Sequence, residues 1–282
     1  MFVKNEQDDG ELTSTVIERV NTLGYKVSEM QEFMNKVNKT KIAPEIKNMK
    51  IASSFTEWTF KKVIREIEDA IEQEAPVKHR KIANNADKRL EDDRQIQPLL
   101  NAHGIEDSQY FEYPLPIQVQ SGDNFTTNKF TSESDDSLIT SDVVYINICG
   151  KYSDMMSMAS RTLIFNPSKT QKEAYTLAFD AQKHLISLLT PGTALDAAYS
   201  QTVEFIKSKN SSLAGKVHSN FGFGIGNKYK EELLSINASN STKVQEGMVF
   251  HVRITFRDVE QQKSKGPIAI GDTVVVDSDG TA

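Results

Sequence analysis

The chain has 282 residues, of which 38% are hydrophobic and 26% charged, values typical of one large globular domain or two small ones. Its formal net charge of -6 argues against a general nucleic-acid binder, because contacts to phosphates need a cationic surface. No apolar run approaches the roughly 18 residues that span a bilayer, and the first residues are acidic where a secretory leader would be basic, so we expect an intracellular chain.

The first part of the chain, residues 1–43, begins polar and acidic. Helix-like runs then follow at 12–23 and 28–37, and Ser28 is a candidate N-cap for the second of them. We interpret residues 1–43 as a lead-in or as the remnant of a preceding lobe, and we assign residues 44–282 to one domain.

Apolar residues recur at three- and four-residue steps from Pro44 to Glu74 and predict the longest helix of the chain. Pro76 ends this helix, and residues 77–92 predict a second one. The second helix contains the basic run KHRK at 78–81. Acidic residues follow this run at once and no aromatic residues are interleaved, so we interpret it as a solvated helix face, without a nucleic-acid site.

A strand-like segment at 110–120 precedes the central feature of the sequence, a predicted β-hairpin from Val143 to Pro167 with its turn at Gly150. Asn147 and Cys149 share one face of the first strand, because side chains alternate along a strand. Cys149 is the only cysteine and lies in an apolar strand, which predicts a buried thiol and no nucleophile. The opposite face carries Val144, Ile146 and Ile148.

Helical periodicity returns after the hairpin, at 174–188 and 195–206, and strands resume at Val217 and continue at 247–256 and 268–277. The order helix, helix, strands therefore occurs twice, once before and once after residue 167. Two such halves can join their sheets side by side with the helices behind, which predicts an α+β cradle.

Four segments carry a resemblance to a known fold: SDVVYINICGKYSDMMSMASRTLIFNPS, NFGFGIGNKYKEELLSIN, VQEGMVFHVRITF and IAIGDTVVVDSDG. Their order and spacing are similar to those of the pita-bread fold of methionine aminopeptidases and creatinases. Within that fold they most resemble the peptidase-like amino-terminal domain of the large subunit of the FACT histone chaperone. The resemblance covers roughly residues 40–282. It implies a pseudo-symmetric antiparallel sheet cradle with helices behind it.

An active aminopeptidase of this fold holds two divalent ions with two aspartates, one histidine and two glutamates, and the resemblance places these ligands on five positions of this sequence. Those positions carry an amide, a thioether, a phenyl ring, a guanidinium and no side chain at all, none of which suits such ions. The guanidinium would repel a dication. The resemblance therefore implies a degenerate site without metal, cofactor or catalysis. The five positions are Asn147, Met158, Phe223, Arg253 and Gly271.

Four further residues are expected to line this degenerate cleft: Lys230, Glu231, His251 and Asp272. Lys230 stands where the peptidases have a second histidine. We expect Arg253 and Lys230 to replace bound cations by fixed ones and to pair with Asp154, Glu231 or Asp272. His251 and Arg253 share one face of a strand, and for His251 hydrogen-bonded packing and a position lining the cleft both remain open.

The resemblance implies a non-catalytic domain of the FACT large subunit that contributes to binding histones or nucleosomes and to reorganising chromatin in transcription, replication and repair. The implied location is the nucleus, on chromosomes. An HMG-box-type or Pob-like partner subunit would engage parts of the full protein absent here, and neither a membrane nor a specific nucleic-acid sequence is an expected partner. Two alternatives stay open, an inactive RNA- or ribosome-binding relative of the same fold and an active metalloaminopeptidase.

Overall fold

The computed structural model describes residues 2–4, 11–25, 27–29, 37–122, 125–140, 142–260, 265–278 and 280–281. They fall into two compact units, Met1–Thr40 and Lys41–Ala282. In the first unit, the strands β1 (Phe2–Lys4) and β2 (Val27–Glu29) pair in parallel, and the helix α1 (Glu11–Thr22) connects them. The predicted helix at 12–23 is thus confirmed. A helix beginning at Ser28 is wrong, because Ser28 pairs with Val3 in the sheet, and residues 30–36 lie outside the described ranges.

The second unit is built on one antiparallel sheet with the strand order β3-β5-β6-β9-β8-β7. In addition, β4 pairs with β5 and β10 pairs with β9. Strands β6 and β9 join the two halves of the unit at the centre of the sheet. The strands are β3 (Phe111–Glu112), β4 (Gln118–Ser121), β5 (Val143–Tyr152), β6 (Met155–Ile164), β7 (Gly222–Gly224), β8 (Val249–Glu260), β9 (Lys265–Asp277) and β10 (Gly280–Thr281).

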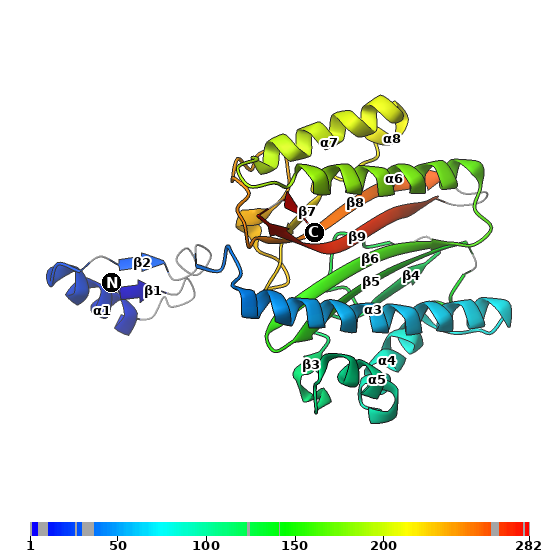
Figure 1. The fold of residues 1–282 in the computed structure, drawn as a ribbon, viewed down its shortest axis with the longest axis horizontal. Helices are drawn as coiled ribbons and strands as arrows, with labels where there is room; N and C mark the ends of the chain where they lie inside the picture. Colours follow the sequence, from blue (N-terminus) through cyan, green and yellow to red (C-terminus); the bar gives the residue numbers. More distant parts are fainter. Residues whose placement is uncertain are drawn as a thin grey trace. The chain divides into compact units, whose positions relative to one another are not determined.

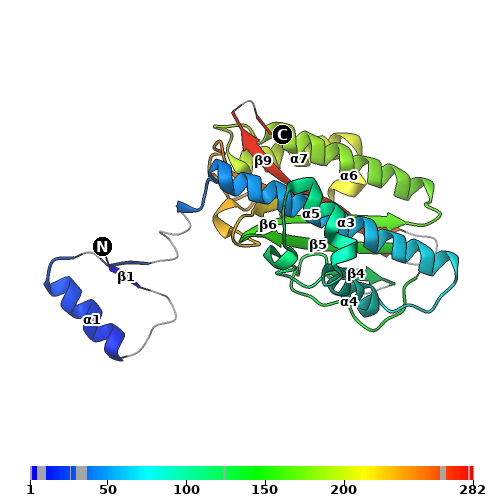
Figure 2. The same ribbon diagram turned by 60° about the horizontal axis from the view of Figure 1, so that its bottom comes forward.

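Two long helices cover one face of this sheet, α3 (Ala43–Glu72) over β5 and β6 and α6 (Lys169–Leu188) over β8 and β9 (Figures 1 and 2). The repeated order of elements thus yields the predicted α+β cradle. Among the described residues, no helix is both long and apolar enough to cross a membrane. The remaining helices are α4 (His79–Leu90), α5 (Asp93–His103), α7 (Leu195–Lys209), α8 (Ser211–Ala214) and the 3-10 turns η1 (Ser108–Tyr110) and η2 (Glu232–Leu234).

The hydrophobic pattern explains which face each helix covers. Residues Val144, Ile146 and Ile148 of β5 pack against the apolar stripe of α3, including Val63 and Ile67. Side chains alternate along the strand, so Tyr145, Asn147 and Cys149 face the other way, as predicted. This other face is called the concave face below.

One sequence prediction in this unit is wrong, and one helix was not predicted. The hairpin turns at Ser153 and Asp154, whose φ angles are +44° and +69°, while Gly150 lies inside β5. Gly150 is needed because α3 crosses closely there. A Cβ at Gly150 would lie 2.6 Å from Thr56 Oγ1 and 2.8 Å from Phe55 Cδ1. The sequence pattern also gave no sign of the helix α5, which contains a proline and begins at its Asp92 N-cap.

Candidate functional site

The structure brings the five predicted ligand positions together on the concave face. One row runs straight across four strands: Asn147 pairs with Ser160, Ser160 with Gly271, and Gly271 with Arg253. The Ser160 hydroxyl donates a hydrogen bond of 2.7 Å to Asn147 Oδ1. Because these residues face each other in register, their side chains share one side of the sheet.

The neighbouring row holds the other two positions. The Met158 amide donates to Thr273 Oγ1 at 2.9 Å, Thr273 pairs with His251, and His251 pairs with Phe223. The His251 ring also donates from Nδ1 to the Met158 carbonyl at 3.1 Å. Five residues that are far apart in sequence therefore form one contiguous patch across five strands.

Side chains already fill the centre of this patch. A Cβ at Gly271 would lie 2.8 Å from His251 Cε1 and 3.1 Å from Arg253 Cγ. A carboxylate side chain at position 271 would need the space that these two residues now occupy. The site therefore differs from a dinuclear centre in shape as well as in its donor atoms.

Replacing Gly271 by alanine is expected to destabilise the domain by about 1–3 kcal/mol, because overpacking a filled core forces neighbouring side chains off their rotamers. Replacing His251 by alanine in the same chain removes the nearest obstacle. The double variant Gly271→Ala/His251→Ala should then lose clearly less than the sum of the two single losses in urea unfolding. Strict additivity would show that the space at Gly271 is open.

A loop between β4 and β5, residues 125–132, lies over Arg253 and is called the covering loop below. Arg253 is 5% exposed. Its guanidinium donates to the carbonyl of Thr127 and, at 3.1 Å, to Asn128 Oδ1, and it stacks 4.8 Å from the ring of Phe130. Phe130 in turn contacts Phe223 edge-on, with 5.3 Å between ring centroids. The arginine therefore ties the loop onto the concave face.

Two glutamines of β4 hold the same covering loop. Gln118 donates from Nε2 to the carbonyls of Lys129 and Ser132, at 2.7 and 3.0 Å. Gln120 exchanges two hydrogen bonds with Thr126, of 2.6 and 2.9 Å. No sequence pattern pointed to this loop, since its main anchor, Arg253, lies more than a hundred residues away.

The electrostatics of the patch disfavour a cation. Burial, reinforced by the charge of Arg253, lowers the pKa of His251 to about 3, so the ring is neutral at neutral pH. Burial likewise raises the pKa of the Cys149 thiol, which excludes a reactive thiolate. Amide, thioether and guanidinium groups are poor ligands for hard divalent ions. Within the ranges given above, no three His, Cys, Asp or Glu side chains lie where they could hold a metal ion.

The expected pairing of the cleft cations is wrong. Lys230 pairs with Glu232 at 2.7 Å, and Arg253 binds the covering loop. Glu231 pairs instead with Lys41 at 2.5 Å, and burial raises its pKa although Lys41 lies beside it. These partners come from the connecting segments, whose position no strand pattern reveals.

The prediction that Asp272 lines the cleft is also wrong. Asp272 follows Gly271 on β9, so its side chain points to the helix-covered face. There it pairs with Arg161 at 2.6 Å and accepts a hydrogen bond from Gln182 of α6 at 3.0 Å. Asp154, at the hairpin turn, lies 3.3 Å from Lys151.

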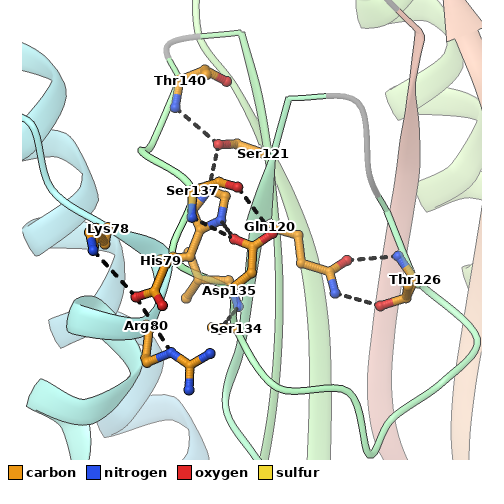
Figure 3. Close-up of polar contacts among 12 residues, drawn as sticks. Lys78, His79, Arg80, Gln120, Ser121, Thr126, Ser134, Asp135, Ser137 and Thr140 are labelled. Carbon is orange, nitrogen blue, oxygen red and sulfur yellow. Dashed lines mark hydrogen bonds and ion pairs between the residues drawn. The ribbon is translucent and has the colours of Figure 1, made fainter.

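A second polar cluster surrounds His79, which the sequence assigned to a solvated face (Figure 3). The residue is 1% exposed. Its Nδ1 donates to Asp135 and its Nε2 accepts from Ser121, each at 2.7 Å, and Ser121 Oγ accepts from the Thr140 amide. Burial by itself would raise the pKa of Asp135. The hydrogen bonds from His79 and Ser137 outweigh this effect, so the pKa of Asp135 lies below its usual value. The signal was present, because position 79 shares the buried stripe of α4 with Ile82, Ala83 and Ala86.

Replacing His79 by alanine is expected to cost about 2–3 kcal/mol of unfolding free energy, because the buried Ser121 hydroxyl loses the acceptor of its proton and a cavity forms. The adjacent Lys78 is a matched control. It is exposed and lies 3.6 Å from Asp136, so Lys78→Ala should change stability by about 0.5 kcal/mol or less. Equal losses in urea unfolding would contradict a structural role for His79.

Comparisons with known proteins agree with this architecture. The chain is 26% identical to the FACT complex subunit SPT16 of Zea mays over 99% of its own length, and it spans 26% of that protein. The N-terminal domain of FACT complex subunit SPT16 from Cicer arietinum superposes with a TM-score of 0.84 at 24% identity, over 99% of this chain and 67% of the other. The prolidase of Pyrococcus furiosus superposes with a TM-score of 0.73 at 19% identity, over 100% of this chain and 75% of its own.

These findings confirm the predicted pita-bread fold and the predicted similarity to the amino-terminal domain of a FACT subunit. The family model of the M24 metallopeptidases matches residues 47–278, which includes every strand of the concave face from β3 to β9. The chain therefore belongs to metallopeptidase family M24.

Proposed function

We propose that residues 44–282 form a non-catalytic peptidase-like domain that acts as a binding module in the large subunit of a FACT-type histone chaperone. The observation that carries the proposal is the filled concave face, in a chain similar over 99% of its length to a FACT subunit. On this proposal, five ligands of an active ancestor have been replaced, at Asn147, Met158, Phe223, Arg253 and Gly271.

The proposed role is to contribute to histone or nucleosome binding and to chromatin reorganisation during transcription, replication and repair, in the nucleus. The chain spans about a quarter of the maize relative, so these roles belong to a larger protein. An HMG-box-type or Pob-like subunit would engage other parts of that protein. Residues 1–43 are proposed to be a lead-in or the remnant of a preceding lobe.

Binding to histones tests the proposed partner directly. The purified chain is immobilised and offered core histones or a structured RNA over a series of salt concentrations. We expect retention of histones that weakens as salt rises, because charge contacts between partners are screened. Retention of RNA in preference to histones would overturn the proposal and favour the RNA- or ribosome-binding alternative.

A peptidase assay tests the absence of catalysis. The chain is incubated with a panel of short peptides and added Mn²⁺ or Co²⁺, and release of the first residue is followed. We expect no release above the buffer control, because neutral and cationic side chains occupy the positions of the metal ligands. Release that a chelator abolishes would establish the active metalloaminopeptidase instead.

A further inference from the structure

A second recess, separate from the filled patch, lies between the covering loop and the far end of the β8–β9 hairpin. It has a volume of 270 Å³. The covering loop contributes Phe125, Asn128 and Lys129 to its wall, and the hairpin contributes Arg257, Asp258 and Lys265. This recess is called the basic pocket below.

The basic pocket has a surplus of positive charge. Lys129, Arg257 and Lys265 line it, and Lys216 donates from Nζ to the carbonyl of Asp258 at 3.0 Å. Two acidic residues are near, Asp258 in the wall and Glu260, whose backbone lies opposite Lys265 in the register of the hairpin. Counted over the described residues around the pocket, four cations against two carboxylates leave two positive charges, on a chain whose net charge is -6.

The cations of the pocket lack the ion pairs that cations form elsewhere on this surface. Exposed lysines of the helices, such as Lys61 and Lys169, pair with a glutamate one turn away. Among the described residues, no carboxylate lies within ion-pair distance of the three lining cations. Their charges are therefore available to an anionic ligand.

The walls of the pocket are fixed before any ligand binds. Arg253 and Gln120 hold the covering loop at Thr127, Asn128 and Thr126. The Arg257 amide donates to the Lys216 carbonyl at 2.9 Å, which holds the opposite wall. A preorganised site loses less conformational entropy on binding. The same arginine that stands at a former ligand position thus shapes this pocket.

We propose that the basic pocket binds an acidic segment of a protein partner through carboxylate or phosphate oxygens. Cationic side chains at a concave site are the usual means of recognising such groups. A nucleic acid fits less well, because Phe125 is the one aromatic side chain among the described residues of the wall and the chain as a whole is acidic. This binding would be additional to the proposed interaction with histones, which are basic.

Fluorescence anisotropy tests the proposal with four labelled probes. These are a peptide of eight glutamates, a peptide of the same length with three phosphoserines, a peptide of eight glutamines and an eight-nucleotide single-stranded DNA. We expect saturable binding of one or both acidic peptides, weakened by salt between about 50 and 300 mM, and no binding of the glutamine peptide. The first two probes distinguish carboxylate from phosphate as the source of the oxygens.

Two triple variants with the same change of charge locate the site. Lys129→Ser/Arg257→Ser/Lys265→Ser removes the pocket cations. Lys47→Ser/Lys88→Ser/Arg94→Ser removes two exposed lysines and one exposed arginine elsewhere. The pocket variant should bind the acidic peptide about tenfold more weakly, since each exposed charge pair contributes roughly twofold, while the control variant should bind as the parent does.

Several outcomes would overturn the proposal. They are the absence of saturable binding to either acidic peptide, equal weakening in both triple variants, or tighter binding of the DNA than of the peptides. A charge-conserving variant, Lys129→Arg/Lys265→Arg, should bind the acidic peptide with the affinity of the parent. Weaker binding by this variant would show that the lysines act through folding. All substituted side chains are exposed, so each variant is expected to unfold at the parent temperature.

Discussion

Replacing Arg253 by methionine is expected to lower the free energy of unfolding by about 2–4 kcal/mol, because two hydrogen-bond acceptors of the covering loop are left without their buried donor. Methionine keeps much of the apolar volume but donates no hydrogen bond. The Thr127 carbonyl and the Asn128 amide oxygen then lose their donor, and Phe130 loses the guanidinium that stacks on it. The covering loop should loosen at Thr127 and Asn128, while Gln118 and Gln120 still hold Thr126, Lys129 and Ser132.

Urea unfolding measures the loss, and limited proteolysis shows where it acts. Arg257 lies four residues further along the same strand and is exposed, so Arg257→Met is a matched control that should cost about 0.5 kcal/mol or less. New cleavage within the covering loop is expected only in Arg253→Met. If both variants unfold at the same urea concentration, the arginine does not anchor the loop.

Lowering the pH from 7 to 4 is expected to cost about 3 kcal/mol of stability through His251 alone. The pKa of this ring is about 3 in the folded chain and about 6.5 when unfolded, because burial and then Arg253 oppose its protonation. Above about pH 6.5 the histidine is neutral in both the folded and the unfolded state, so it causes no loss of stability there. Below that, the unfolded state binds a proton that the folded state does not, so stability falls until the pH reaches the folded pKa.

The measurement compares unfolding free energies of the parent and of His251→Gln at several pH values. Carboxylates titrate in both proteins, so the difference between the curves isolates the histidine. That difference should change by about 1.4 kcal/mol per pH unit between roughly pH 6 and 4. If the curves of the parent and of His251→Gln instead ran parallel over this pH range, the neutral, buried state of His251 would be contradicted.

Much of the fold could be predicted because its elements are periodic. The stripe of α3 from Met49 to Ile67 and the alternation of β5 each report which face is buried, and both predictions hold. The predictions failed where the conformation of a residue depends on a contact with a residue far away in the sequence. Gly150 suggested a turn, but a glycine is needed there because α3 packs closely against β5. The turn of the hairpin lies at Ser153 and Asp154 and contains no glycine that would have marked it in the sequence.

In the site, too, regular strands made some positions predictable, whereas contacts with irregular segments were not predictable. Motif spacing placed five positions that the sheet indeed brings together, because the register of paired strands fixes which residues are neighbours. The partners of the charged groups could not be predicted in this way. Arg253 donates a hydrogen bond to the Thr127 carbonyl, and Glu231 forms an ion pair with Lys41. Thr127 and Lys41 lie in connecting segments whose sequences have no regular pattern. Asp272 was expected to line the cleft, but it follows Gly271 on β9, and adjacent residues of a strand face opposite sides of the sheet.

The filled concave face also bears on how alleles of this protein should be interpreted. Substitutions at Gly271 or Arg253 are expected to lower the fraction of folded molecules, and cells degrade unfolded chains, so a loss of one or two kcal/mol can change abundance several-fold. A growth defect from such an allele would therefore reflect how much protein survives quality control, and immunoblots of steady-state levels should accompany any genetic screen of this region.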